Sequence, residues 1–223
     1  MKVLIFCQVD SSQMPAKEKS DFVKIKKLHD FEAPELVIND RIALDDVKQS
    51  YKKIPKGFLE PKDQSLLDSI VNTHWPSGKK VISHNALHLG NVLYDKDRFW
   101  FIDWEIAGLS HPFYDLAYFA NFQLLSKEAG KKLLAIYLER QVTDEEFRDL
   151  NILRKITFGF TASTMLDEVT SFHADLKISR KEEETRLSLK DFFAALSLGK
   201  IDLTDERTIY RSSLLFLRAS EAF

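Results

Sequence analysis

Two short stretches of the chain carry side chains that could bind a metal ion and act on phosphate. Residues 82–91 read ISHNALHLGN, and residues 99–105 read FWFIDWE. Asn91 and Asp103 each adjoin apolar residues, on what the pattern predicts to be the two arms of a tight hairpin. Antiparallel arms would bring these two oxygen-bearing side chains together. One amide oxygen and one carboxylate, with space left for phosphates and water, form a donor set that Mg²⁺ accepts, and Glu105 could add a second carboxylate.

The hairpin that positions these residues is predicted from short apolar runs. Strands are expected at 80–82, 92–94 and 99–102, the last two flanking the turn Asp95–Asp97. After His111-Pro112 the pattern becomes helical. Two helices are expected at 114–125 and 127–140. A third is expected to begin at a capping box at 143–146 and to run to about 175, with a break at Gly159. The last two are expected to begin at 179–182 and at 204–207.

The N-terminal part of the chain has weaker signals. A buried strand is expected at 3–7, a linker at 8–19, and a helix from about 20 to Pro34. Weak helical turns at 44–52 and a helix around 66–71 follow, with loops at 55–57 and Pro61. We therefore expect a mainly helical α+β chain, with a remnant strand and linker at 1–19 and one large lobe at 20–223.

The motifs HNALHLGNVLYD (84–95) and FWFIDWEIAGLSHPFYDLAYF (99–119) resemble the catalytic core of the aminoglycoside phosphotransferase and choline kinase superfamily. That superfamily has the protein-kinase-like fold, and its motifs are His-x-Asp-x-x-x-x-Asn and Ile-Asp-Trp/Phe-Glu. The resemblance implies that Asn91 and Asp103 hold Mg²⁺ and ATP phosphates and that His84 orients the loop. It also implies that Asp115 anchors this loop and that Glu105 and Trp104 face the substrate.

The chain departs from the family pattern at two places. Ala86 occupies the position of the family's aspartate base, and a methyl group cannot accept the proton of a substrate hydroxyl. Losing a positioned base lowers a rate about 10²- to 10⁴-fold. The first glycine is Gly57, so the first 56 residues contain no Gly-rich phosphate-covering loop. We therefore expect a kinase-like C-terminal lobe whose N-terminal lobe is largely missing.

Composition limits the partners. The 223 residues carry a net charge of −2, so no basic field indicates nucleic acid. No apolar run is long enough to span a membrane, and a single cysteine, Cys7, excludes an internal disulfide. We expect a cytoplasmic protein.

Several functions remain open at this stage. The first is a degenerate kinase-like protein, weak or inactive in phosphorylating a small, choline-like amino-alcohol. The second is an active kinase completed by a partner chain or a second copy, and the third is a helical interaction module without a ligand. A zinc hydrolase using His84 and His88 is disfavoured, because Asn85 stands where that motif needs glutamate. A substrate cation could be bound by an aromatic wall formed by Trp104, Tyr114, Tyr118 and Phe122. A negative charge to attract this cation could come from Glu105, or from Asp167 and Glu168.

Overall fold

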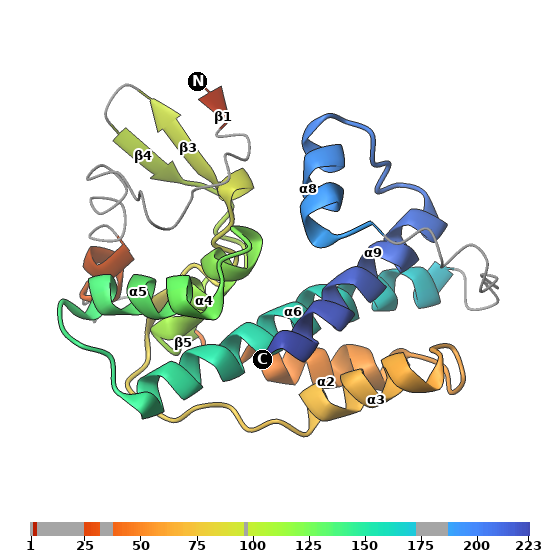
Figure 1. Ribbon diagram of the computed structural model, residues 1–223, viewed down its shortest axis with the longest axis horizontal. Helices are drawn as coiled ribbons and strands as arrows, with labels where there is room; N and C mark the ends of the chain where they lie inside the picture. The colour runs from red at the N-terminus through yellow and green to blue at the C-terminus, as the bar shows by residue number, and fades with distance from the viewer. Residues whose placement is uncertain (1, 4–24, 32–37, 96–97, 173–186) are drawn as a thin grey trace. The chain divides into compact units, whose positions relative to one another are not determined.

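The computed structural model describes residues 2–3, 25–31, 38–95, 98–172 and 187–223 (Figure 1). Helices dominate the described residues, as predicted, and the strands are short. Contacts divide the chain into two compact units, one comprising 1–42 with 76–154 and the other 43–75 with 155–223. No helix among the described residues is both long enough and apolar enough to cross a membrane.

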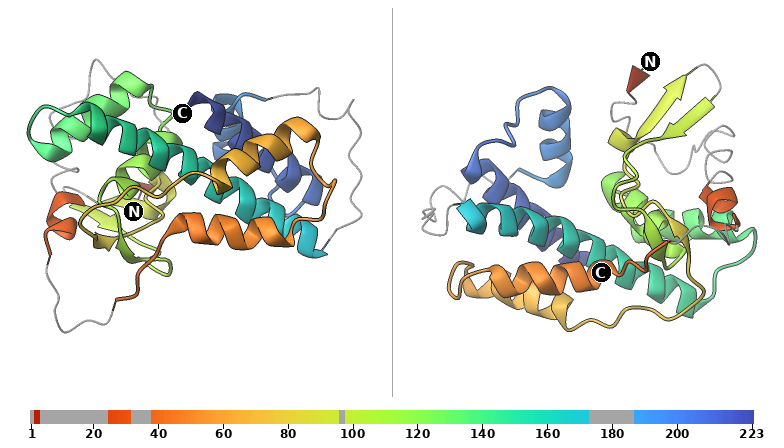
Figure 2. Two further views of the ribbon diagram at one scale, coloured as in Figure 1. Left: turned by 90° about the horizontal axis from the view of Figure 1, so that it is seen from below. Right: turned by 180° about the vertical axis from the view of Figure 1, so that it is seen from behind.

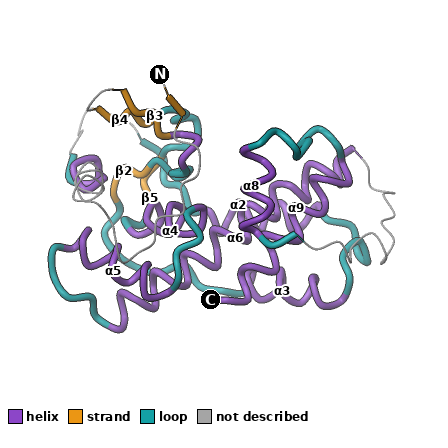
Figure 3. Tube along the Cα trace, turned by 45° about the horizontal axis from the view of Figure 1, so that its top comes forward, coloured by secondary structure: helices purple, strands orange, loops and turns teal. Residues whose placement is uncertain are grey.

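The strands of the first unit form two small antiparallel sheets (Figure 3). In one, β3 (Val92–Asp95) lies between β1 (Lys2–Val3) and β4 (Arg98–Phe101). In the other, β2 (Val81–Ser83) pairs with β5 (Gly108–Ser110). The register of β3 and β4 joins Val92 to Phe101, so the predicted hairpin is confirmed. Of the strand predicted at 3–7, residues 4–7 lie outside the described part.

Two helices follow β5 in the first unit, and a third begins there. These are α4 (Phe113–Phe122), α5 (Lys127–Leu138) and the first part of α6 (Asp144–Phe172). The buried Arg154 of α6 donates hydrogen bonds to Asn121 Oδ1 and to the carbonyl of Leu125, which fixes the turn between α4 and α5. The predicted capping box is present, since Thr143 Oγ1 accepts from the Glu146 amide and the Glu146 carboxylate accepts from the Thr143 amide.

The described residues of the second unit contain helices and connecting turns but no strand. It contains α2 (Ala43–Lys53), α3 (Pro61–Val71), the rest of α6, α8 (Leu189–Ser197) and α9 (Glu206–Ala219). Helix α3 contacts both α2 and α9, and Figure 2 shows these segments side by side. Asp63 of α3 is buried and accepts two hydrogen bonds from Arg218 of α9. Because two guanidinium nitrogens meet both carboxylate oxygens, this pair fixes the orientation of the two helices.

Three sequence predictions need correction or lie outside the described residues. Pro61 begins α3 rather than forming a loop, because the first helical position needs no amide hydrogen bond. Helix α9 begins at Glu206 with Asp205 as its cap, one residue after the predicted cap at Thr204. The helix opening predicted at 179–182 lies outside the described residues, and Ser188 caps α8 instead.

The predicted break of α6 at Gly159 is wrong, because α6 continues through this residue to Phe172. The glycine serves close packing. A Cβ at this position would lie 2.6 Å from Ile70 Cγ2 and 3.0 Å from Ile70 Cδ1, and Ile70 is fully buried in α3. The missing side chain lets α3 approach the backbone of α6.

We expect Gly159→Ala to destabilise the protein by about 1–3 kcal/mol, because overpacking against Ile70 outweighs a gain of about 1 kcal/mol in helix propensity. Urea unfolding measures the change. The substitution Ile70→Val keeps the methyl that the new Cβ meets, whereas Ile70→Ala removes it. The cost of Gly159→Ala should therefore persist in the Ile70→Val background and disappear in the Ile70→Ala background. An equal cost in both backgrounds would contradict this account.

Candidate functional site

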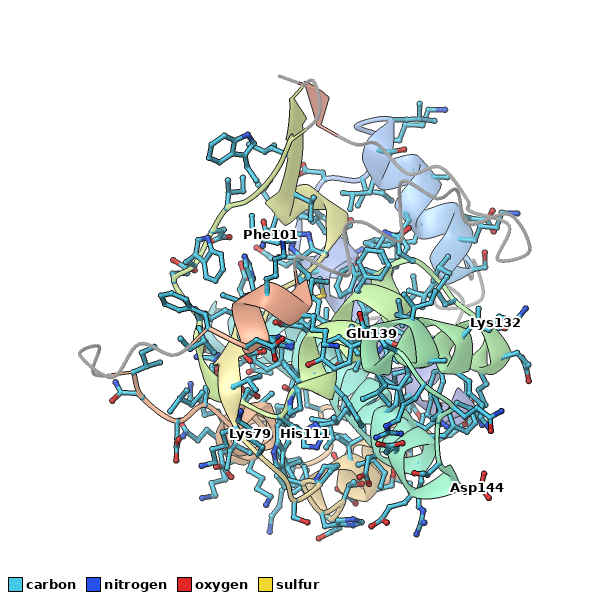
Figure 4. All side chains as sticks on the ribbon, turned by 90° about the vertical axis from the view of Figure 1, so that its left-hand side faces the viewer. Lys79, Phe101, His111, Lys132, Glu139 and Asp144 are labelled. Atoms are coloured by element: carbon cyan, nitrogen blue, oxygen red, sulfur yellow. The ribbon has the colours of Figure 1, made fainter. Side chains whose placement is uncertain are left out.

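The hairpin brings the two predicted metal-binding residues to one end of its arms. Asn91 ends a 3-10 turn (Leu89–Asn91) immediately before β3, and Asp103 follows β4 by two residues. The Ile102 amide donates to the Asn91 carbonyl at 3.0 Å, which extends the ladder one step beyond Phe101, labelled in Figure 4. Asn91 is therefore paired with Ile102, the residue immediately before Asp103.

Asn91 is fixed by its amide nitrogen. Its Nδ2 donates to the Ala86 carbonyl at 3.0 Å, and the residue is only 6% exposed. Within the described part of the chain, no hydrogen bond uses Asn91 Oδ1. The bond to Ala86 thus orients the amide and leaves its oxygen as a donor to a cation.

Asp103 has a backbone conformation that is uncommon for a residue with a side chain. Its φ is 64°, in the left-handed region, and the residue is exposed. Such a conformation costs about 1–3 kcal/mol unless the surroundings impose it, and it concentrates at functional sites. The strained turn places a carboxylate at the end of the hairpin, beside the Asn91 backbone.

The two oxygen donors fit a magnesium ion whose other ligands are nucleotide phosphates and water. The described residues contain no group of three His, Cys, Asp or Glu side chains that could hold a metal ion. Asn91 and Asp103 supply two hard oxygen donors, and Mg²⁺ characteristically takes one or two protein oxygens together with phosphates and water. The remaining positions would be left for a nucleotide.

Ala86 contributes its backbone rather than its side chain. Its carbonyl accepts from Asn91 Nδ2 and from the His88 amide at 2.9 Å. The residue is buried, at 8% exposed. The backbone of Ala86 therefore supports the loop, and its methyl side chain offers no proton acceptor.

His84 joins this loop to the segment that carries Asp103. The ring is completely buried, its Nε2 donates to the Ile102 carbonyl at 2.8 Å, and its Nδ1 accepts from the Ala86 amide at 3.3 Å. Donation from Nε2 and acceptance at Nδ1 describe a neutral imidazole with its proton on Nε2. Both ring nitrogens are used within the protein, so neither is left to bind zinc.

Asp115 lies beneath the loop and is fully buried. Its Oδ1 accepts from the Asn85 amide at 2.8 Å, and its Oδ2 accepts from the His84 amide at 2.9 Å. Burial raises the pKa of this carboxyl, but the hydrogen bonds from His29 and from the two backbone amides outweigh burial and lower it. Asp115 is therefore an ionised anchor for two consecutive amides of the loop.

His29 is a site residue that sequence reasoning did not assign a role. It lies in the helical residues 25–29, within KKLHDF, and is 3% exposed. Its Nε2 lies 3.1 Å from Asp115 Oδ2, and its Nδ1 lies 2.9 Å from the Tyr137 hydroxyl. The sequence offered one signal, a lone histidine among apolar and basic residues, which does not reveal partners 86 and 108 positions away.

His88 is held by aromatic packing on the other side of the loop. Its ring stacks on Phe122 at 5.3 Å, and its Nδ1 accepts from the Gly90 amide at 3.1 Å. Burial lowers the pKa of His88, against an opposing effect of the Asp103 charge. Gly90 is required here, because a Cβ would lie 2.8 Å from the His88 ring.

The residues expected to face a substrate divide into exposed and buried groups. Trp104 is 41% exposed, with its Nε1 donating to the Phe101 carbonyl at 2.9 Å, and Glu105 is exposed. Tyr114 and Tyr118 are buried, and Tyr118 stacks on Phe122 at 4.8 Å. Trp104 and Glu105 therefore remain available to a ligand, whereas the tyrosines pack in the interior.

Comparison with known proteins settles the family. The model of the phosphotransferase enzyme family (APH) matches residues 26–150, a span that includes the loop, the hairpin, His29 and Asp115. This chain belongs to that family.

Protein LicA of Haemophilus influenzae is 33% identical to this phosphotransferase-family chain over 99 residues, which are 42% of the chain and 37% of that protein. A second Haemophilus influenzae LicA is 32% identical over 99 residues, 29% of its length. The chain thus spans about a third of the curated relatives it matches.

Solved structures of the family share the fold. A choline/ethanolamine kinase family protein from Mesorhizobium loti aligns with a TM-score of 0.61 at 13% identity, over 96% of this chain and 70% of that one. Choline kinase LicA from Streptococcus pneumoniae aligns with a TM-score of 0.56 at 11% identity, over 98% and 69%. The predicted kinase-like fold class is therefore confirmed, with the N-terminal lobe largely absent from this chain.

His111 links the strand β5 to α4, the helix that carries Asp115. It is 6% exposed, its Nδ1 accepts from the Phe113 amide at 3.1 Å, and burial lowers its pKa to about 4. Figure 4 labels it near Lys79, and the backbone at Gly78 approaches its ring, since a Cβ there would lie 3.2 Å from His111 Nε2. The ring must stay neutral to accept the Phe113 amide.

This burial predicts a pH dependence of stability. Between the folded pKa of about 4 and the unfolded value of about 6.5, the unfolded chain binds more protons, so stability is complete above about 6.5 and declines as pH falls toward 4. The full contribution is about 3 kcal/mol. We expect His111→Asn, whose side-chain oxygen can still accept from Phe113, to lose less stability between about pH 7.5 and pH 5 in urea unfolding. An identical loss in parent and variant would refute the assignment.

Proposed function

We propose that this chain is a degenerate member of the phosphotransferase family that binds Mg²⁺–ATP and a small, choline-like amino-alcohol but transfers phosphate weakly or not at all. One observation carries the proposal. The oxygen of Asn91 accepts no hydrogen bond among the described residues, the exposed Asp103 follows Ile102, whose amide bonds to Asn91, and the residue at the expected base position is the buried Ala86.

The expected reaction explains why the methyl matters. A substrate hydroxyl oxygen forms a bond to the γ-phosphorus as the bond from that phosphorus to the ADP oxygen breaks, and the hydroxyl proton must go to an acceptor. Bound Mg²⁺ would neutralise charge on the phosphates. Asn91 and Asp103 would supply the protein oxygens to that ion, and His84 bonds to the carbonyl of Ile102, the residue before Asp103. With Ala86 the proton passes to solvent, which slows but does not forbid transfer.

The substrate class is drawn from exposed groups and from relatives. Trp104 presents an aromatic ring and Glu105 a negative charge next to Asp103, a combination that attracts a quaternary or primary ammonium. The Streptococcus pneumoniae relative is a choline kinase, and a LicA structure was solved with AMP. Both support a nucleotide and a choline-like alcohol here, and a nucleotide-using protein of this kind would act in the cytoplasm.

The second candidate is an active kinase whose nucleotide-covering lobe comes from a partner protein or a second copy. The retained Asn91 and Asp103 favour it, because the Asn91 oxygen accepts no hydrogen bond among the described residues and the Asp103 carboxylate is exposed at the end of the hairpin. In that case affinity for nucleotide should rise with chain concentration or on addition of the partner.

Calorimetry of Mg²⁺–ATP binding to the parent, to Ala86→Asp and to Asp103→Ala tests the proposal. We expect the parent and Ala86→Asp to bind, and Asp103→Ala to bind more weakly, by about 10-fold or more, because it removes one of two metal donors. With choline present, Ala86→Asp should consume ATP about 10²- to 10⁴-fold faster than the parent.

Two outcomes would redirect the assignment. If neither the parent nor Ala86→Asp binds at any chain concentration, the metal-site proposal fails and a helical interaction module without a ligand is favoured. If the parent alone turns over choline as fast as Ala86→Asp, the chain is not degenerate and another group accepts the proton. Asp144→Ala, at an exposed position in α6, is the matched control for loss of a surface carboxylate.

A further inference from the structure

We infer that His29 and Tyr137 are positioning residues for the loop at 84–91, acting through Asp115. The inference rests on the proposed function, because it concerns how that site is held in shape. Three buried side chains form one continuous path, from the Tyr137 hydroxyl to His29 Nδ1 at 2.9 Å and from His29 Nε2 to Asp115 Oδ2 at 3.1 Å. The path ends at the amides of His84 and Asn85.

The anchor at the end of this path needs a third donor. Asp115 is a fully buried carboxylate, and such a charge is stable only when paired and hydrogen-bonded. The two loop amides each occupy one oxygen. The only side chain that donates to this carboxylate among the described residues is His29. Without His29, only the two loop amides would restrain the carboxylate. The carboxylate could then rotate, and the loop would lose a fixed hydrogen-bond acceptor.

Tyr137 fixes the His29 ring. Burial raises the pKa of the Tyr137 hydroxyl, and the charges of Asp30 and Asp115 add to the effect, so this hydroxyl keeps its proton. It can donate to His29 Nδ1, which leaves the imidazole proton on Nε2, facing Asp115. The two rings also meet edge to face at 5.6 Å. Orientation and tautomer of His29 are therefore set by one residue of α5.

The connected segments lie far apart in the sequence. This path joins the segment 25–31 to helix α5 and to the loop at 84–91. His29 is 108 positions from Tyr137 and 86 positions from Asp115. A second link, Lys26 to Glu139 at 2.6 Å, joins the same segment to the end of α5, but it is solvent-exposed. Exposed ion pairs contribute little, so the buried path carries the positioning.

The test compares variants that remove one bond at a time. His29→Leu removes both hydrogen bonds at similar volume, His29→Gln keeps an amide donor that can reach Asp115, and Tyr137→Phe removes only the hydroxyl. Lys26→Ala, which breaks the exposed pair, is the matched control. Amide hydrogen exchange at His84 and Asn85 reports directly on the loop. Exchange at Arg41 and Leu109, whose amides bond beside β5 in the same unit, reports on the surrounding fold.

In His29→Leu we expect exchange at His84 and Asn85 to accelerate at least about 10-fold more than at Arg41 and Leu109, and Mg²⁺–ATP binding to weaken about 10- to 100-fold, as for other residues that orient a metal-binding group. His29→Gln should restore most of both. Tyr137→Phe should give a smaller change in the same direction, and Lys26→Ala none.

The two proposals fail in different ways. Unchanged exchange at His84 and Asn85 in folded His29→Leu, or His29→Gln behaving like His29→Leu, overturns the positioning role. If His29→Leu does not fold, Tyr137→Phe decides, because uniform exchange across the unit in that variant would equally contradict the inference. If the parent binds no nucleotide while the exchange pattern holds, the proposed function is wrong and the positioning of the loop by His29 stands.

Discussion

The arrangement of the site depends on one buried carboxylate. Asp115 accepts the amides of two consecutive residues, His84 and Asn85, and at Asn85 the backbone takes a φ of 63°. Two adjacent amides can reach both oxygens of one carboxylate only where the chain turns sharply. That turn directs Ala86 and the following residues toward the hairpin, and the Asn91 side chain then bonds back to the Ala86 carbonyl. The shape of the loop therefore follows from where a single negative charge is buried.

The hairpin performs the complementary task for the other half of the site. Its register pairs Val92 with Phe101 and Asp95 with Arg98, and the added bond from Ile102 to Asn91 brings Asp103 beside the loop. His84 completes the connection by donating to the Ile102 carbonyl. None of these contacts involves the side chain at position 86. The contacts that hold the loop therefore do not depend on which side chain occupies position 86.

Local signals in the sequence predicted local structure well. The hairpin at 92–102 and the capping box at 143–146 are present because alternating apolar residues and cap residues act within a few positions. The break at Gly159 was wrong for the opposite reason. Glycine lowers helix propensity, but here the space of its missing Cβ is filled by Ile70, a residue of another helix that sequence spacing cannot indicate.

The sequence by itself determined the family and the hairpin, because those rest on motifs whose members lie close to one another along the chain. Its assignment of Asn91 and Asp103 as metal donors stays a prediction. Only the tertiary structure decided that His29 and Tyr137 support Asp115, and that His111 is buried and neutral at the start of α4. Hydrogen bonds across 86 and 108 residues leave no periodic trace in a sequence. Buried polar groups need hydrogen-bond partners within the protein because they have lost water. Which partners are available depends on which segments pack together in the folded chain.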